Sequence, residues 1–218
     1  MLPPSPELTD WQVRSLVAVG RSAIGNDVVF GGGAALASVY LHHRFSEDLD
    51  FFLRREPADA ELAEIAKVLR TKGTSIDQRV VGPVRTLVLR KGEEEFGRID
   101  FAFSPHVRAE APIAWHGFKV ESLRDMTINK VQTVLTRFKA RDFVDLYFLL
   151  QEGPERNLET LLDLVRTKFD LGADRLTLAE RLTMVRDIRE LPRMLRPVDL
   201  GEVRAYFWDR ARELIRKG

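Results

Sequence analysis

The sequence predicts an α+β protein: a mixed sheet with flanking helices in its first part, followed by an entirely helical part. Short apolar strands and helical segments follow one another irregularly up to Glu121, which excludes a regularly alternating doubly wound fold. From Leu123 the strand signals stop, and helical periodicity continues almost to Gly218. We therefore expect two domains, residues 1–121 and 122–218, with the helical domain closing a cleft. A chain of 218 residues is long enough for two modest cores.

The expected elements follow from apolar spacing, glycine and proline stops and runs of β-branched residues. In order they are a helix over Glu7–Ile24, a strand over Asp27–Phe30, a helix over Ala34–Leu41, a strand over Asp48–Leu53, a helix from Ala58 to Gly73, and strands over Ser75–Val81, Val84–Arg90, Phe96–Phe103 and His116–Glu121.

Composition narrows the class of protein. Hydrophobic residues make up 44% and charged residues 31%, as in ordinary folded proteins. The absence of cysteine excludes disulfides, thiolate zinc sites and cysteine nucleophiles. The net charge of +1 does not indicate a nucleic-acid binder, although the second half is slightly basic and permits a polyanionic partner. No apolar run approaches a membrane span and MLPPSPELTDW lacks a signal pattern, so we expect a cytoplasmic protein without membrane contact.

Two carboxylates stand two residues apart in one predicted strand. Asp48 and Asp50 therefore share a face, whereas Leu49 and Phe51 point to the other. Neighbouring carboxylates repel unless a cation compensates, and hard oxygen ligands suit Mg²⁺ bound to substrate phosphates. A solvated strand end is the alternative, but the apolar flanks and upstream glycines favour a magnesium site.

A third carboxylate, Asp100, lies in the strand GRIDFAF on the face opposite Ile99 and Phe101. It points either to solvent or into a polar site. Together with Asp48 and Asp50 it would complete the three carboxylates that two metal ions need for in-line phosphoryl transfer. Asp100 is then also a candidate for removing the acceptor's proton.

Glycines precede the carboxylate strand and a short helix. Gly32 and Gly33 expose backbone N–H groups that suit a phosphate, and Arg44 and Ser46 are placed to contact phosphate or to orient Asp48. A tight turn without a ligand is the alternative. The pattern is neither a P-loop nor a GxGxxG motif.

A second group of charges lies in NKVQTVLTRFKARDFVDLYFLL, residues 129–150. Lys130, Arg137 and Arg141 fall at helical spacing, so that one helical face would carry three cations for triphosphate oxygens. Asp142 and Asp145 follow among apolar residues. Ordinary helical ion pairing, such as Arg141 with Asp145, is the alternative. The histidines lack metal-ligand spacing, and we assign them no catalytic role.

The segment GGGAALASVYLHHRFSEDLDFF resembles the signature of the AbiEii/AbiGii toxin nucleotidyltransferases, within the DNA polymerase β-like superfamily. The matching positions are Gly32, Gly33, His43, Arg44, Ser46, Asp48 and Asp50. The later block KVQTVLTRFKARDFVDLYFL is similar to the second family motif through Lys130, Arg137, Arg141, Asp142 and Asp145. The resemblance covers roughly residues 28–150. Ala34 departs from it, because the family often has Thr there.

The resemblance implies a nucleotidyltransferase-like fold and a Mg²⁺- or Mn²⁺-dependent transfer of a nucleoside monophosphate from an NTP. It implies Asp48 and Asp50 as metal ligands and supports Asp100, inferred from the strand pattern, as the third, because the superfamily usually has a third carboxylate. It further implies Lys130 as a catalytic residue, and Gly32, Gly33, Arg44, Ser46, Arg141 and Asp142 as nucleotide- and phosphate-binding residues. Several such toxins modify tRNA 3′ ends and are controlled by a separately encoded antitoxin. A small-molecule or protein acceptor, or an inactive nucleotide-binding domain, are the alternatives.

Overall fold

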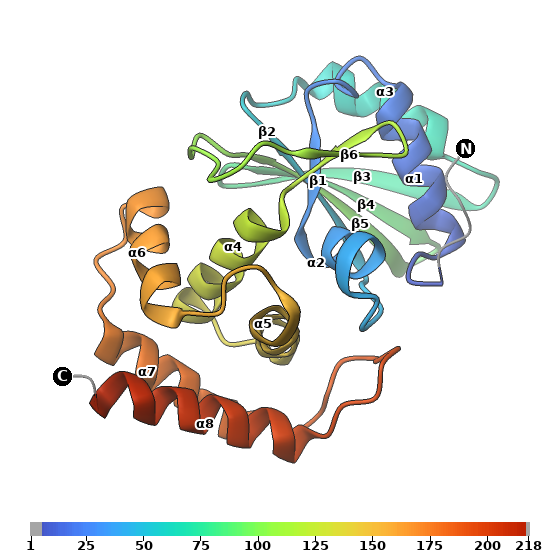
Figure 1. Cartoon of the computed structure of the whole chain (residues 1–218). Coiled ribbons are helices and arrows are strands. Elements are labelled where there is room, and N and C mark those ends of the chain that lie inside the picture. The colour runs from blue at the N-terminus through green and yellow to red at the C-terminus, as the bar shows by residue number, and fades with distance from the viewer. Residues whose placement is uncertain (1–5, 217–218) are drawn as a thin grey trace. The chain divides into compact units, whose positions relative to one another are not determined.

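A computed structural model describes residues 6–216 (Figure 1). Met1–Ser5, Lys217 and Gly218, which the predicted domain limits include, lie outside the described residues. The chain divides into two compact units. The first comprises the described residues up to Tyr40 together with Phe45–Pro105 and Ala111–Glu121. The second comprises Leu41–Arg44, His106–Glu110 and the described residues from Ser122 onward. Two short segments of the first part thus belong to the helical unit.

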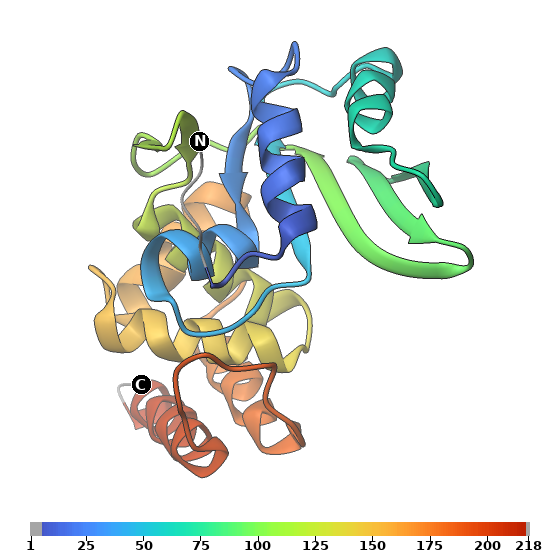
Figure 2. The same cartoon turned by 90° about the vertical axis from the view of Figure 1, so that its right-hand side faces the viewer.

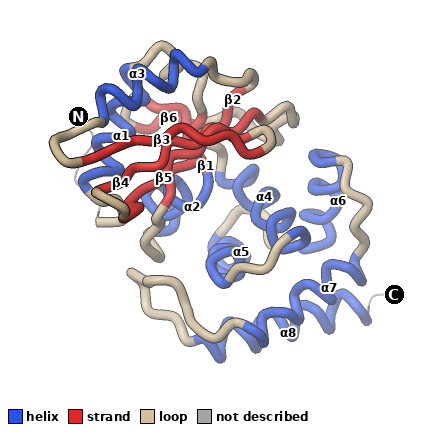
Figure 3. The backbone as a smooth tube through the Cα atoms, turned by 180° about the vertical axis from the view of Figure 1, so that it is seen from behind, coloured by secondary structure: helices blue, strands red, loops and turns tan. Residues whose placement is uncertain are grey.

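The first unit contains a mixed sheet, which confirms the predicted fold class. Its seven described strands run in the order β3-β4-β5-β2-β1-β7-β6. Figure 3 shows strands in red and helices in blue. Their bounds are β1 Val29–Gly31, β2 Asp48–Leu53, β3 Thr74–Val81, β4 Val84–Lys91, β5 Glu94–Phe103, β6 Ile113–Trp115 and β7 Phe118–Val120. β2 pairs in parallel with β5 and antiparallel with β1, so these three strands form the middle of the sheet.

One face of this sheet is apolar and covered. Phe51 of β2 stacks on Phe101 of β5 with ring centroids 5.5 Å apart, and both side chains are fully buried. Helix α1 (Asp10–Arg21) packs on this face. Its Trp11 ring lies so close to Gly97 of β5 that a Cβ added to this glycine would meet the ring at 2.9 Å. Helix α3 (Asp59–Leu69) lies on the same side, since Arg85 of β4 pairs with Asp59 at 2.6 Å. Figure 2 shows α1 beside the strands. The opposite face carries the polar residues of β2 and β5.

Several predicted elements needed correction. The helix expected over Ala34–Leu41 is a short α-helix, α2 (Gly32–Ala35), that continues as a π-helix over Leu36–Leu41. β6 was not predicted; it pairs antiparallel with β7 through a turn at Gly117, which has a φ of 87°.

The second unit is helical, as predicted. Its helices are α4 Leu123–Thr136, α5 Ala140–Glu152, α6 Leu158–Phe169, α7 Arg175–Thr183 and α8 Leu200–Arg216, with a 3₁₀ turn over Met184–Asp187. Leu161, Leu178 and Phe207 lie in its apolar core. Three of these helices have a side-chain N-cap: Ser122, Asn157 and Asp174 accept hydrogen bonds from backbone N–H groups of the first turn. No described helix has the length and apolar character needed to span a membrane.

The prediction that Lys130, Arg137 and Arg141 lie on one face of a single helix is wrong. α4 ends at Thr136, Arg137 is extended with φ −144° and ψ 166°, and α5 begins only at Ala140. The three cations therefore do not form a single helical stripe.

Candidate active site

The three predicted metal ligands lie on one face of the first unit's sheet. Asp48 and Asp50 alternate on β2 with fully buried Leu49, as the period of two requires. In the parallel register, Asp50 stands opposite Asp100 of β5. Adjacent strands lie about 4.8 Å apart, so these two carboxylates are close neighbours.

Asp100 has a fixed orientation. Thr86 of β4 lies opposite it in register and donates a hydrogen bond from Oγ1 to Asp100 Oδ1 at 2.6 Å. Burial raises the pKa of Asp100, while Thr86 and Arg98 act in the opposite direction and the nearby Asp48 carboxylate adds to the rise. Thr86 was not among the predicted site residues. The signal that reveals it is its place in the strand register, which the sequence does not display.

Gly32 is required by the position of Asp50. It has a φ of 66°, and a Cβ added there would lie 2.0 Å from Asp50 Oδ2. Gly31, the preceding residue, stands opposite Asp50 in the β1–β2 register. The glycine turn thus meets the carboxylate strand directly, and any side chain at Gly32 would displace the carboxylate. Gly33 follows as the second residue of α2.

Ser46, predicted to contact phosphate, is buried in the segment that leads into β2. Its backbone carbonyl accepts a hydrogen bond from Gln12 Nε2 of α1 at 2.8 Å. This bond ties the segment before the carboxylates to the helix beneath the sheet.

Hard carboxylate oxygens on one face match the donor set that Mg²⁺ or Mn²⁺ prefers. The described residues contain no group of three or more His, Asp or Glu side chains arranged as a ready metal site. A magnesium ion in a nucleotidyl-transfer site usually takes one or two carboxylates and completes its shell with water and phosphate. The residues therefore fit an ion that arrives with a nucleotide.

Four charged residues of the second block form a network with Arg44 around two buried carboxylates within the second unit. Asp145 of α5 is fully buried and accepts from Arg44 Nε at 2.6 Å and Nη2 at 2.7 Å. Lys130 Nζ of α4 lies 2.6 Å from Asp145 Oδ2 and 3.0 Å from Asp142 Oδ1. Arg137 completes the network through Asp142, at 2.8 Å and 3.1 Å. We call these residues, with His43, the ion network.

Burial and neighbouring charges shift the pKa values of Asp145 and His43 in the ion network. Burial alone would raise the pKa of Asp145, but the charges of Arg44 and Lys130 outweigh it and hold that pKa well below its usual value. Burial lowers the pKa of His43. Its neutral ring then donates from Nε2 to Asp145 Oδ1 at 2.7 Å, while Nδ1 has no hydrogen-bond partner in the described chain.

The structure thus separates the predicted residues into two groups. Asp48, Asp50, Asp100, Gly32 and Gly33 belong to the sheet of the first unit, with Ser46 beside them. Arg44, Lys130, Arg141 and Asp142 belong to the second unit. Two nitrogen atoms of Arg44 already bind Asp145, so phosphate binding by this side chain stays a prediction. Arg141 is half-buried in the first turn of α5.

The match to a protein family is decisive. The profile described as "Nucleotidyl transferase AbiEii toxin, Type IV TA system" matches residues 14–204, which is most of the chain. The chain belongs to the AbiEii nucleotidyltransferase toxin family. That family's Type IV toxin–antitoxin assignment implies an antitoxin partner. No curated protein sequence matches the chain.

Solved structures agree on the fold of this AbiEii-family chain. JHP933 from Helicobacter pylori is 20% identical with a TM-score of 0.57, over 94% of this chain and 89% of that one. MenT4, described as the nucleotidyltransferase toxin Rv2826c from Mycobacterium tuberculosis H37Rv, is 19% identical with a TM-score of 0.60, over 93% of this chain and 81% of that one. At these identities the likeness shows the fold alone.

Proposed function

We propose that this chain transfers a nucleoside monophosphate from an NTP to the 3′ end of an RNA, with tRNA as the acceptor, and acts as the toxin of a toxin–antitoxin pair. The observation that carries the proposal is the register of β2 and β5, which sets Asp50 beside Asp100, with Asp48 on the same face. Membership of a nucleotidyltransferase family supports the reaction class. The acceptor rests on the family resemblance and is the part that most needs a test.

In the proposed reaction, the acceptor hydroxyl oxygen attacks the α-phosphorus of the NTP. An oxygen–phosphorus bond forms as the bond to pyrophosphate breaks, and the hydroxyl proton passes to Asp100. Asp48, Asp50 and Asp100 hold Mg²⁺ or Mn²⁺, which supplies positive charge against the phosphate oxygens when bound.

Binding of the triphosphate is assigned to backbone and cationic groups. Gly32 and Gly33 offer N–H groups where their turn meets the carboxylate strand, and Ser46 lies just before that strand. Lys130 and Arg141 supply positive charge, and Asp142 orients Lys130 at 3.0 Å.

The test incubates the full chain with Mg²⁺, each α-labelled NTP and total tRNA. Asp48→Asn removes one metal ligand, and Glu47→Gln is its matched control because Glu47 is the exposed neighbour of Asp48. We expect label on tRNA with the wild-type chain and Glu47→Gln, and none with Asp48→Asn. tRNA whose 3′-terminal ribose has been oxidised with periodate should accept no label.

Other outcomes would revise the proposal. Label on the protein or on a small-molecule pool, but not on tRNA, would retain the transferase and overturn the RNA acceptor. Equal labelling by Asp48→Asn and wild type would overturn the assignment of the carboxylates. No label on any acceptor would overturn the transfer reaction itself.

A further inference from the structure

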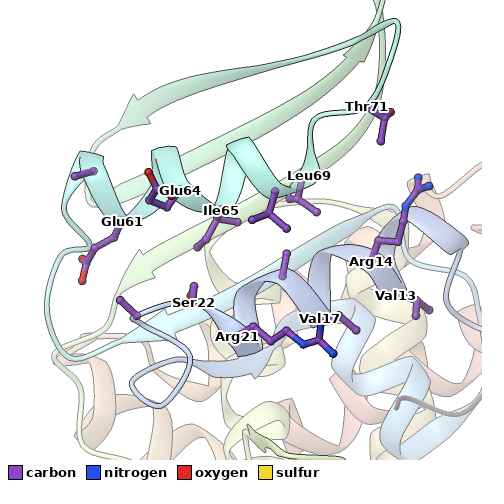
Figure 4. A pocket seen from close by; sticks show the side chains of 14 residues that line it. Val13, Arg14, Val17, Arg21, Ser22, Glu61, Glu64, Ile65, Leu69 and Thr71 are labelled. Carbon is purple, nitrogen blue, oxygen red and sulfur yellow. The ribbon is translucent and has the colours of Figure 1, made fainter.

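An apolar groove runs between α1 and α3 in the first unit, with a volume of about 880 Å³ (Figure 4). It lies on the covered side of the sheet, the side where Trp11 meets Gly97, whereas Asp48, Asp50 and Asp100 occupy the other face. The groove is therefore a feature separate from the proposed catalytic residues, and nothing in the proposed reaction uses it.

α1 lines the groove with a regular stripe. Its contributions fall at positions i, i+1, i+4, i+5 and i+8, namely Val13, Arg14, Val17, Ala18 and Arg21. This spacing is one face of a helix, about 12 Å long at 1.5 Å per residue. The groove is consequently elongated along the helix.

α3 lines the other side with the same spacing: Ala60, Glu61, Glu64, Ile65 and Val68. Ile65 is buried in the floor, whereas Val68 is 70% exposed. The groove thus has one row of side chains from each helix and an apolar floor. The side chains of a further helix can pack into a surface of this kind. Contact with such a helix would remove Val68 from water, which is favourable.

The two rims of the groove differ in charge. On the α3 rim, Glu61 forms an ion pair with Arg55 at 2.7 Å, and Glu64 forms one with Lys67 at 4.0 Å. On the α1 rim, Arg14 and Arg21 make no hydrogen bond or ion pair with any described residue. Both are exposed, and they stand seven residues apart, about 10.5 Å or two helical turns.

We propose that the α1–α3 groove binds an amphipathic helix of a separate polypeptide. Apolar residues of that helix at i, i+3, i+4 and i+7 fill the groove, and two acidic residues seven positions apart pair with Arg14 and Arg21. The matching two-turn spacing of cations and carboxylates sets the register of the occupant. A small ligand fits less well, because the polar groups lie along the rim instead of converging inside the groove.

The proposal is tested with a fluorescein-labelled helical peptide of about fifteen residues, bearing leucines at the four anchor positions and two glutamates seven apart. A second peptide carries lysines in place of the glutamates. Fluorescence anisotropy measures binding to the full chain, and hydrogen-exchange mass spectrometry locates the protected segments. We expect the glutamate peptide to bind, to protect α1 and α3, and to exceed the lysine peptide in affinity by about tenfold or more.

Charge reversal gives the sharper comparison. The double variant Arg14→Glu/Arg21→Glu should reverse the preference and bind the lysine peptide more tightly. Arg212→Glu, on the exposed side of α8, is the matched control and should keep the wild-type preference. Val68→Asp, at an exposed position, should weaken both peptides without unfolding the chain.

Three results would overturn the proposal: no binding of either peptide, protection outside α1 and α3, or a double variant with the wild-type preference. Nucleotide transfer is measured on the same variants in the absence of peptide. Because the groove lies on the face opposite the carboxylates, the double variant should transfer nucleotide at the wild-type rate whatever the peptides do. A failure of the groove proposal is thereby distinguished from a failure of the proposed reaction.

Discussion

The two units treat their charged residues in opposite ways. In the first unit, Asp48, Asp50 and Asp100 are half-buried carboxylates gathered on one sheet face, and burial raises the pKa of Asp100. In the second unit, Asp142 and Asp145 are fully buried and surrounded by cations, which lower the pKa of both. Half-buried carboxylates gathered on one face suit an incoming cation, whereas a fully buried carboxylate among cations is needed to hold those cations in place. Substitutions in the two groups should accordingly affect different properties.

The largest effect on activity is expected from Asp48→Asn. Loss of one metal ligand should reduce nucleotide transfer to background. The melting temperature should stay within a few degrees of wild type, because Asn has nearly the same shape as Asp and the position is only half-buried. Label transfer and calorimetry on the same preparation measure both properties. A large drop in melting temperature would assign Asp48 a structural role instead.

The largest effect on stability is expected from Asp145→Asn. It removes the buried carboxylate that Arg44 and Lys130 share and leaves Lys130 paired with Asp142, which should cost about 3–5 kcal/mol of unfolding free energy. Urea denaturation checks this, with Asp163→Asn, an exposed carboxylate on α6, as the control. If Asp145→Asn unfolds like wild type, the ion network does not stabilise the second unit.

Gly32→Ala should damage the first unit locally. A Cβ at φ 66° and 2.0 Å from Asp50 Oδ2 forces the carboxylate away, and a strained backbone costs roughly 1–3 kcal/mol. Transfer should fall much further than stability. Gly82→Ala is the control, because it has a similar φ of 56° but no atom within 4 Å of the added Cβ. Equal effects of both variants on transfer would show that Gly32 has no special relation to Asp50.

The sequence predicted more of the charged residues' arrangement in the first unit than in the second. The shared face of Asp48 and Asp50 and the opposite face for Leu49 follow from the period of two, which is local. The partners of Asp145 do not follow from any local pattern, since Arg44 lies 101 residues away in the sequence and reaches Asp145 only through tertiary folding. The break between α4 and α5 was missed for a similar reason: Arg137 leaves the helix where its guanidinium binds buried Asp142. Apolar periodicity predicts faces, not long-range charge partners.

Acid should destabilise the second unit through Asp125. Burial would raise its pKa, but Lys168 at 2.6 Å and the N–H groups of Ala109 and Glu110 lower it. A lowered folded pKa means that the stabilisation is complete above the ordinary Asp pKa of about 3.9 and is lost as pH falls through the folded value. Urea titrations from pH 6 to pH 2.5 should show a smaller loss for Asp125→Asn than for wild type. Parallel curves would contradict this.

The smallest effect is expected from Thr86. Thr86→Val keeps the shape but removes the 2.6 Å hydrogen bond to Asp100, whereas Thr86→Ser keeps the hydroxyl. A hydrogen bond to a charged group is worth roughly 1.5–3 kcal/mol. We expect Thr86→Val to weaken Mn²⁺ binding and transfer, and Thr86→Ser to restore most of both. Equal behaviour of the two variants would mean that the hydroxyl does not position Asp100.

Metal binding by Asp48, Asp50 and Asp100 can be measured directly. Electron paramagnetic resonance can follow free Mn²⁺ as it is titrated with the full chain in the presence of a non-hydrolysable NTP analogue. We expect wild type and Glu47→Gln to bind Mn²⁺ together with the nucleotide, and Asp48→Asn not to bind it. If Asp48→Asn binds Mn²⁺ as tightly as wild type, the three carboxylates are not the metal site.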